Sequence, residues 1–524
     1  MDKNIKSTPS DLIPIGIRRV KEPVILRKKS SPNITKRAST AWNSIEWTKV
    51  YKTIRNLRYR IFKATKRGDF KTVRNLQRLL IHSYEIKLLA VRQICQINEG
   101  KKKAGLDKLL IKSSQKRGKL VDLLREVCLT DWQRTPVKPV YVPKDLTQWK
   151  GFGNQTIIDR CLQYIVKNAL EPEWEAKFEA TSYGFRPGRS CHDALHRIYN
   201  NCAHHRAKKV WVVNGTVTGC FDQFEHQYLM KAIGSFPAKL LIEAWLKNGY
   251  LDQNLFDHTI LGTSHGGVIS PLLANIALHD IHQPLDISLS KDGETIGDRS
   301  IVRYADAFVV FCKTEEDAKC CKTILNKWLS ERGLNGLKAK MRILDIDRGF
   351  DFLGMNVRRY PVNRADGEIK NKLLIKPDQK SISKCREKLK QIWIKGQGKP
   401  VLLTITGLNS LIRSWANHFK PYLSKEVFAS LDNSMFAYAV RFTRRTHPMK
   451  SWGWRKNRYF GKFHPEREDK WVFGNKETGH YLLKFSWVDI QRHTMIKADS
   501  SPDNPELSKY WEKRNAKKSK EEIK

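Results

Sequence analysis

A short turn, Tyr304-Ala305-Asp306-Ala307, constrains the fold of this chain more than any other feature. Apolar runs flank it on both sides, Ser300-Ile301-Val302-Arg303 before it and Phe308-Val309-Val310-Phe311-Cys312 after it. Two runs rich in β-branched and aromatic residues, joined by so short a turn, predict a buried β-hairpin. Such a hairpin lifts the carboxylate of Asp306 out of a sheet, where it can serve as a ligand for a hard cation. The sequence therefore predicts a buried sheet whose tip presents an acid.

The charge balance indicates a polyanionic partner. Lysine and arginine number 97 against 53 aspartate and glutamate residues, which gives a formal net charge of +44 over 524 residues. A field of this size attracts long nucleic acid. The alternative, a basic protein with no such partner, is less favoured because the excess runs along the whole chain. Aromatic residues make up 10% of the chain, which excludes a disordered basic tail protein.

Cysteine usage and hydropathy bear on the compartment. The ten cysteines form no Cys-x-x-Cys pair, which argues against a zinc ribbon or a disulfide framework and favours reduced thiols. No stretch approaches the roughly 18 apolar residues of a membrane span, and the first residues have no apolar signal core. Basic residues near the N-terminus leave an organellar transit segment open, but Pro9, Pro14 and Pro23 would interrupt its helix. We therefore expect a cytoplasmic protein without membrane contact.

Composition and periodicity divide the chain into five segments, with boundaries at 1–40, 41–205, 206–375, 376–440 and 441–524. The first is a basic arm, the third an α+β segment and the fourth a helical bundle. Apolar spacing predicts helices over 42–66, 70–97, 108–130, 159–170 and 315–331, and strands over 137–142, 210–213, 342–344 and 350–357. This order of elements indicates a sheet with helices on one face. The polar tail from Asp499 is expected to fray.

Basic helix faces, a basic loop and an arginine-bearing turn are the first candidates for contact with phosphates. They contribute Arg55, Arg58, Lys63, Lys101, Lys102, Lys103, Arg186 and Arg189. A second candidate surface lies between Arg441 and Lys470, where ten basic residues accompany three acids and six aromatics. Rings in such a mixture can stack on bases while cations hold phosphates. Its candidates are Arg444, Arg445, Trp452, Trp454, Arg455 and Lys456. The alternatives are an ordinary solvated face and an aromatic core with a basic rim.

Motifs over most of the chain, in a fixed order, resemble group II intron-encoded reverse transcriptases and maturases of the bacterial type. They are Tyr183-Gly184-Phe185-Arg186-Pro187-Gly188, Gly219-Cys220-Phe221-Asp222, Gly266-Gly267-Val268-Ile269-Ser270-Pro271-Leu272, Phe350-Asp351-Phe352-Leu353-Gly354 and Leu408-Asn409-Ser410-Leu411-Ile412-Arg413-Ser414-Trp415-Ala416-Asn417. The resemblance implies an α+β right-hand reverse-transcriptase fold, with fingers in 41–205 and a palm in 206–375. It further implies an all-α thumb, called maturase domain X, and a small basic DNA-binding region. In the thumb it adds Arg413, Trp415 and Asn417 as RNA-binding candidates.

The same resemblance implies a function. Members of this family bind the group II intron RNA that encodes them and promote its splicing as a ribonucleoprotein, and many copy the RNA into DNA. The implied partners are intron RNA and, as a further candidate, target DNA; the oligomeric state stays open. Mg²⁺ would act mainly through the bound RNA, in the cytoplasm of a bacterium, with an organelle less favoured. Many members carry a His-Asn-His nuclease with cysteine pairs, and the lack of such pairs predicts that this nuclease is absent.

The expected metal site departs from the family pattern. The family places one acid at the end of a buried strand, where this chain has Thr216, and two in the hairpin, where it has Asp306 and Ala307. Two divalent metals about 3.5–4 Å apart catalyse phosphoryl transfer and need several carboxylates. Only Asp306 keeps its acid, as a remnant and a weak metal ligand on its own. Asp222 lies six residues beyond Thr216 and is a poor substitute.

Two more departures concern the same nucleotide site. Ser264-His265 stands where the family usually has Pro-Gln. Lys150-Gly151-Phe152-Gly153-Asn154-Gln155-Thr156 stands where a basic stretch resembling Arg-Pro-Leu-Gly-Ile-Pro-Thr contacts the incoming triphosphate, and it keeps one cation but loses both prolines. We therefore predict a maturase that has lost reverse transcriptase activity. The alternative is an RNA-directed DNA polymerase that still works with an altered metal site. A non-functional relic is disfavoured, because the apolar patterns that carry the fold are uninterrupted.

Overall fold

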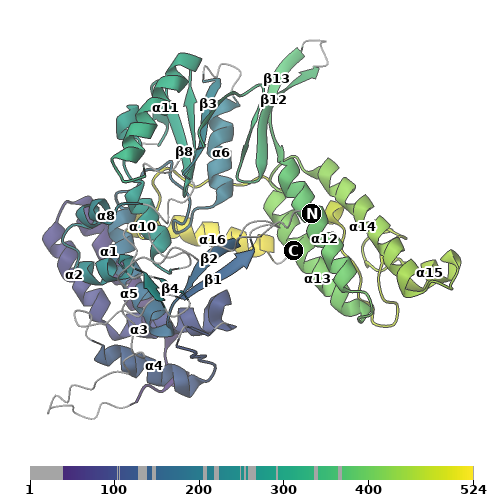
Figure 1. The fold of residues 1–524 in the computed structure, drawn as a ribbon, viewed down its shortest axis with the longest axis horizontal. Helices are drawn as coiled ribbons and strands as arrows, with labels where there is room; N and C mark the ends of the chain where they lie inside the picture. Colours follow the sequence, from purple (N-terminus) through teal and green to yellow (C-terminus); the bar gives the residue numbers. More distant parts are fainter. Residues whose placement is uncertain are drawn as a thin grey trace, which may run out of the picture.

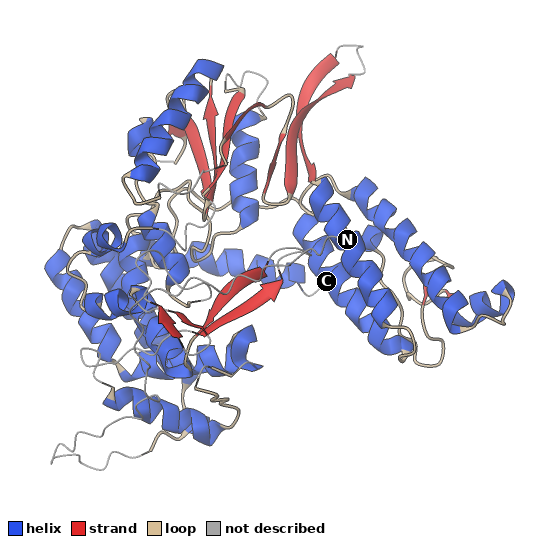
Figure 2. Ribbon diagram, viewed as in Figure 1, coloured by secondary structure: helices blue, strands red, loops and turns tan. Residues whose placement is uncertain are grey.

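The computed structural model describes residues 39–102, 104–105, 107–127, 138–143, 149–203, 209–217, 224–247, 250–252, 255–257, 267–290, 293–334, 340–363 and 369–522. Figure 1 shows a helical N-terminal part, a sheet-containing middle part and a second helical part toward the C-terminus. A long two-stranded ribbon lies between the sheet of the middle part and the C-terminal helices (Figure 2). Mixed helix and sheet followed by a helical bundle is the fold class that the sequence predicts.

The described residues of the N-terminal part include five α-helices. They are α1 (Trp47–Lys66), α2 (Phe70–His82), α3 (Tyr84–Arg92), α4 (Ser114–Glu126) and α5 (Ile157–Glu175). The helix expected over 70–97 is broken at Ser83, whose hydroxyl accepts a hydrogen bond from the Ile86 amide and so starts α3. The helix expected over 108–130 likewise begins only after Ser113, which caps α4. These serines are helix starts that the apolar spacing alone did not locate.

A hairpin of β1 (Lys138–Pro143) and β2 (Trp149–Asn154) lies between α4 and α5. β1 confirms the strand predicted over 137–142. The sequence did not predict β2, which contains two glycines and lacks the apolar run of a buried strand.

The sheet of the middle part, which we call the palm sheet, has four antiparallel strands in the order β10-β3-β9-β8. They are β3 (Trp211–Thr216), β8 (Ser300–Tyr304), β9 (Ala307–Cys312) and β10 (Arg342–Asp345). Val310 and Cys312 pack with α11 (Glu315–Ser330), whereas Val309 and Phe311 pack on the opposite side with α6 (Cys191–Cys202). Both faces are therefore covered by helices (Figure 1), and the expectation of helices on one face is wrong. Neighbouring side chains of a strand point to opposite faces, and β9 is buried without interruption from Phe308 to Cys312, so both faces of the sheet need a cover.

Short elements complete the middle part: α8 (His226–Ile233), α9 (Lys239–Leu246), β4 (Tyr250–Asp252), β5 (Leu255–Asp257), α10 (Ser270–Ala277), β6 (Ser288–Leu289) and β7 (Thr295–Ile296). A three-stranded sheet of β11 (Phe350–Phe352), β12 (Met355–Asn363) and β13 (Ile369–Pro377) follows. The strand expected over 350–357 is thus two strands, because Leu353 and Gly354 adopt φ of 52° and 84° and turn the chain back.

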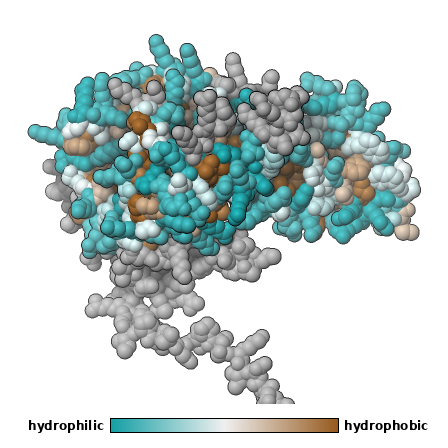
Figure 3. Space-filling model, turned by 90° about the horizontal axis from the view of Figure 1, so that it is seen from above, coloured by the Kyte–Doolittle hydropathy of each residue, from teal (hydrophilic) through white to brown (hydrophobic). Residues whose placement is uncertain are grey.

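Three helices form the C-terminal bundle, as the apolar stripes predict. They are α12 (Gln379–Lys395), α13 (Val401–Phe419) and α14 (Lys425–Thr446). Beyond them lie α15 (Trp452–Tyr459) and a small sheet of β14 (Phe460–Gly461) and β15 (Val472–Phe473). Seen from above, the surface is mostly hydrophilic with separate hydrophobic side chains among the polar ones (Figure 3). None of the helices in the described ranges is both long and apolar enough to span a bilayer.

The last part of the described chain returns from the bundle to the N-terminal part and the palm sheet. It ends in α16 (Ser508–Glu522), drawn in yellow in Figure 1. Trp511 is 7% exposed and Asp503 is 4% exposed, so the expected fraying from Asp499 is wrong. The polar side chains of this segment form ion pairs with residues much earlier in the sequence, Asp503 with Arg58 and Arg514 with Asp193. We call residues 488–522 the C-terminal return.

Candidate nucleotide site and nucleic-acid interface

The three positions of the expected metal site are adjacent at one end of the palm sheet. Thr216, the last residue of β3, pairs directly with Ala307, the first residue of β9. Asp306 lies in the turn between β8 and β9, and its carbonyl oxygen accepts a hydrogen bond of 2.9 Å from the Val217 amide. Thr216 is exposed, and Asp306 and Ala307 are half-buried. The turn therefore brings together one carboxylate, one hydroxyl and one methyl group.

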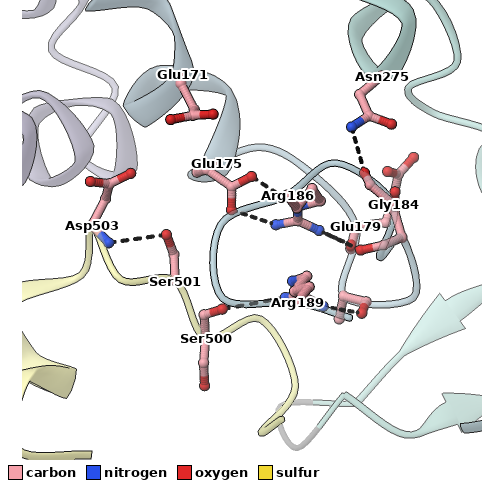
Figure 4. Close-up of polar contacts among 12 residues, drawn as sticks. Glu171, Glu175, Glu179, Gly184, Arg186, Arg189, Asn275, Ser500, Ser501 and Asp503 are labelled. Carbon is pink, nitrogen blue, oxygen red and sulfur yellow. Dashed lines mark hydrogen bonds and ion pairs between the residues drawn. The ribbon is translucent and has the colours of Figure 1, made fainter. Parts of the chain in front are cut away.

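The backbone of this turn is held by a buried polar network. Arg303 is 1% exposed, and its Nη1 donates to Asn275 Oδ1 at 3.0 Å and to the Ala305 carbonyl at 3.2 Å. Asn275 Nδ2 in turn donates to the Gly184 carbonyl at 2.8 Å (Figure 4). Ala305 has φ of 56°, and a Cβ on Gly184 would lie only 2.2 Å from its nitrogen. The stretch Tyr183-Gly184-Phe185 thus packs on the turn and fixes its shape.

The side chains at the turn do not fit a pair of divalent metals. Among the described residues, the groups of three or more potential ligands close enough for one ion do not include Asp306. A single carboxylate beside Thr216 and Ala307 gives too little negative charge for two dications. Asp222 and His265 lie outside the described residues, and Lys150 is described only as backbone in β2. We therefore derive no metal-dependent step from this turn.

Arg186 is not placed at the surface, as the sequence led us to expect. It is 4% exposed, and its Nε and Nη2 donate to the two carboxylate oxygens of Glu175 at 3.0 Å each. Its Nη1 donates to the carbonyls of Glu179 and Ser182 at 2.7 and 2.9 Å (Figure 4). Every Arg186 nitrogen is therefore used inside the protein, and the prediction that it contacts RNA is wrong.

Arg58 and Arg189 were also predicted to contact RNA, and the structure likewise pairs them with groups inside the protein. Arg58 donates to both carboxylate oxygens of Asp503 at 2.7 Å and to Glu171 at 2.8 Å, with its side chain 13% exposed. Arg189 donates to the carbonyls of Ala180 and Ala498 at 2.7 and 2.9 Å. Burial, and the nearby charge of Arg186, lower the pKa of Arg189 to about 10. Both guanidinium groups hold the C-terminal return rather than a ligand.

The remaining candidates differ in exposure. Arg55, Lys63, Lys101, Arg413 and Asn417 are exposed. Trp415 is half-buried, with its ring centroid 4.1 Å from that of Phe419 and 5.7 Å from that of Phe485, so it packs the bundle. Lys102 is described only as backbone, and Lys103 lies outside the described residues.

The second candidate surface is formed by the end of α14, by α15 and by the loop between them. We call it the α14–α15 surface and define it by Arg444, Arg445, Lys450, Trp452, Trp454, Lys456 and Arg458, all of which are exposed. Arg455, predicted with them, is half-buried. No acid occurs in the sequence from Arg441 to Pro465, and the acid that pairs with Arg458 is Glu477, at 3.6 Å.

Trp454 is an exposed aromatic side chain of this surface, and protein groups hold its ring in place. Its ring packs edge-on against His447 at 4.9 Å, and His447 Nε2 lies 2.7 Å from the Tyr459 hydroxyl. Lys450 Nζ and Arg458 Cζ lie 5.5 and 5.6 Å from the Trp454 centroid. A cavity of about 380 Å³ adjoins the ring, lined by Val401, Trp454, Asn457, Arg458, Tyr459, Asn475, Lys476 and Glu477. Sequence reasoning missed Lys450 and Arg458, although the helical spacing of Trp454 and Arg458 signals a shared face.

Comparison with known proteins agrees with the motifs. Residues 42–124 match the N-terminal domain of reverse transcriptase, residues 142–357 match reverse transcriptase (RNA-dependent DNA polymerase), and residues 382–460 match the group II intron, maturase-specific domain. Protein YkfC of Escherichia coli K12 is 32% identical over 277 residues, covering 46% of this chain and 71% of that protein.

Two further relatives carry more informative names. Group II intron-encoded protein LtrA of Lactococcus lactis subsp. cremoris is 34% identical over 189 residues, covering 35% of this chain and 30% of LtrA. Maturase-like protein 1 of Euglena gracilis is 24% identical over 378 residues, covering 71% of this chain and 76% of that protein. With all three parts of the fold matched in order, the chain belongs to the family of group II intron-encoded reverse transcriptases and maturases.

Proposed function

We propose that this protein is a group II intron maturase that has lost reverse transcriptase activity. The observation that carries the proposal is the palm turn, where Thr216, Asp306 and Ala307 lie together with one carboxylate among them. The reverse transcriptase family generally uses Mg²⁺. Replacing two acids by neutral side chains removes most of the charge that attracts such ions. What the chain retains is a strongly basic surface on the same fold.

The partner that this surface fits is the structured RNA of a group II intron, with target DNA as a further candidate. A net charge of +44 supplies attraction to phosphates without sequence preference. The residues proposed to contact RNA are those that the structure leaves exposed: Arg55, Lys63, Lys101, Arg413, Asn417, Arg444, Arg445, Lys450, Trp452, Trp454, Lys456 and Arg458. Mg²⁺ would then act through the RNA.

In this mechanism the protein performs no bond-making step. Cations on α1, α13 and the α14–α15 surface hold phosphates of distant RNA segments, which lowers the repulsion between those segments. Exposed rings such as Trp454 stack on unpaired bases and fix their position. The protein therefore favours the folded arrangement in which the RNA carries out its own transesterification.

A second candidate function is an RNA-directed DNA polymerase with an altered metal site. The intact network of Arg303, Asn275 and Gly184 favours it, because the turn keeps its shape. Asp306 would then be indispensable. The two functions thus predict different consequences for the same variant, Asp306→Asn, which removes the charge and keeps the volume.

The test is a pair of assays on purified full-length protein. Wild type and Asp306→Asn are expected to stimulate splicing of the cognate intron equally at low Mg²⁺, and neither is expected to extend an RNA-templated primer with Mg²⁺ or Mn²⁺. Primer extension by wild type that Asp306→Asn abolishes would establish the second function instead. Failure of both proteins to stimulate splicing, or to bind the intron, would remove the first.

A further inference from the structure

A cluster of soft metal ligands lies where the palm sheet's helix α6 meets the thumb helix α13. Cys191 and His192 are the first two residues of α6, and His418 lies in the last turn of α13. Their ligand atoms all lie within 4.8 Å of one another, and all three side chains are half-buried. The proposed function uses none of them. We propose that the protein carries a zinc site at this junction, with Cys191, His192 and His418 as ligands.

The ligand set selects the metal. One thiolate and two imidazoles are typical of Zn²⁺, whereas Mg²⁺ and Ca²⁺ prefer oxygen ligands. Zinc bonds of about 2.3 Å to sulfur and 2.0–2.1 Å to nitrogen place tetrahedral ligands roughly 3.3–3.6 Å apart. The ligand atoms, which lie within 4.8 Å of one another, therefore need to approach by at most about 1.5 Å, which side-chain rotation can provide. Three protein ligands leave a fourth position for water.

The surroundings provide the second layer that such a site needs. The Tyr422 hydroxyl lies 3.1 Å from His192 Nδ1, and such a contact orients the ring. The ring of His493 lies 5.4 Å from that of His192, and its Nε2 is 2.8 Å from Asp193 Oδ1.

A metal at this position has a mechanical consequence that does not depend on the proposed function. It would join the first turn of α6 to the end of α13, and so fix the angle between the palm sheet and the thumb. His493 brings the C-terminal return to the same place. Zinc would therefore stabilise the folded chain by linkage, since the unfolded chain has no preformed site.

The experiment uses untagged full-length protein, freed of nucleic acid in high salt because RNA carries its own divalent ions. After treatment with a chelator and then Zn²⁺, gel-filtered wild type is expected to retain the zinc of the proposed site, about one ion per chain. Cys191→Ser and His418→Gln are expected to lose it. Cys320→Ser, which changes the exposed cysteine on α11, is the matched control and is expected to keep it. Equal zinc in Cys191→Ser and wild type would overturn the proposal.

A spectroscopic measurement guards against variants that fold poorly. Co²⁺ in place of Zn²⁺ is expected to give wild type and Cys320→Ser a thiolate-to-cobalt charge-transfer band and tetrahedral visible bands. Cys191→Ser is expected to lack the charge-transfer band. Zn²⁺ should also raise the Tm of wild type but not that of His418→Gln. Absence of the cobalt bands from wild type would refute the site, and this result does not depend on how any variant folds.

Discussion

The arginines of the fingers and the cations of the α14–α15 surface look alike in the sequence, yet the structure uses them in opposite ways. Three acids spaced by two along α5, Glu171, Glu173 and Glu175, each bind one arginine in the interior. Their partners are Arg58, Arg74 and Arg186. The α14–α15 surface has no acid in its sequence, and its cations stay in water. The position of acids, more than the number of cations, separates structural arginines from candidate RNA contacts.

The energetic difference between the two regions is large. Two buried and mutually hydrogen-bonded charges support each other, but removal of one leaves the other desolvated and unpaired. At the α14–α15 surface, Arg458 and Glu477 form an ion pair of 3.6 Å with both side chains about half exposed or more. Solvent screens such a pair, which contributes at most about 1 kcal/mol. Substitutions in the fingers should therefore change stability, and substitutions at α14–α15 should change binding.

The largest expected effect is that of Arg186→Ala. It leaves the carboxylate of Glu175 buried at 3% exposure without its partner, so the free energy of unfolding should fall by about 3–5 kcal/mol. Urea denaturation followed by circular dichroism measures it. Arg445→Ala is the control and should change stability by less than about 0.5 kcal/mol. A stable Arg186→Ala variant with weakened RNA binding would reverse the comparison.

Glu173→Gln should make the free energy of unfolding less dependent on pH, because it removes a buried charge of the N-terminal part. Burial alone would raise the pKa of Glu173, but hydrogen bonds from Arg74 and Lys177 hold it below its usual value. A depressed folded pKa stabilises the fold above the unfolded pKa of about 4.3, and this contribution is lost as the pH falls through the folded value. The variant should therefore be about 2–3 kcal/mol less stable than wild type at pH 7.

The difference between wild type and Glu173→Gln should shrink below about pH 4.3, where the unfolded carboxylate becomes protonated. Denaturation midpoints of both proteins from pH 3.5 to pH 7 test this. A difference that stays constant over the whole range would mean that the charge of Glu173 contributes nothing, and that packing alone accounts for the loss.

Trp454→Ala tests the other side of the comparison. Loss of one stacking ring should weaken intron RNA binding by about 1–2 kcal/mol, measured by filter binding at fixed salt. Trp454→Phe keeps an aromatic face and should recover most of the affinity, while both variants unfold as wild type does. If Phe binds as poorly as Ala, stacking is not the interaction that the tryptophan provides.

Arg445→Ala should give the smallest change, visible mainly in the salt dependence. Removal of one phosphate contact should reduce the slope of log K against log salt by about 1. Lys319→Ala is the matched control, because Lys319 is exposed on α11 but lies 2.9 Å from Glu315. Its substitution should leave the slope unchanged. Equal slope changes for both variants would mean that the α14–α15 surface has no special part in binding.

Local sequence patterns predicted the helices and strands around the candidate site, but they did not predict ion pairs between residues far apart in the sequence. The hairpin at Asp306 follows from apolar runs on both sides of a turn, and its proximity to Thr216 follows from the family motifs. The burial of Arg58 could not be predicted, because Asp503 is far along the chain and nothing near Arg58 signals it. Apolar stripes predicted the helix faces, but Ser83 and Ser113 start new helices because their hydroxyls accept hydrogen bonds from the Ile86 and Lys116 amides.

The C-terminal return also determines the order in which this protein can mature on the ribosome. Arg58 gains its partner Asp503, and Asp193 gains Arg514, only after the C-terminal return has been synthesised. Until then Arg58 has one acidic partner fewer, and a basic nascent chain attracts any RNA nearby. Synthesis of the C-terminal return thus helps to decide which cations of the folded protein stay exposed to RNA.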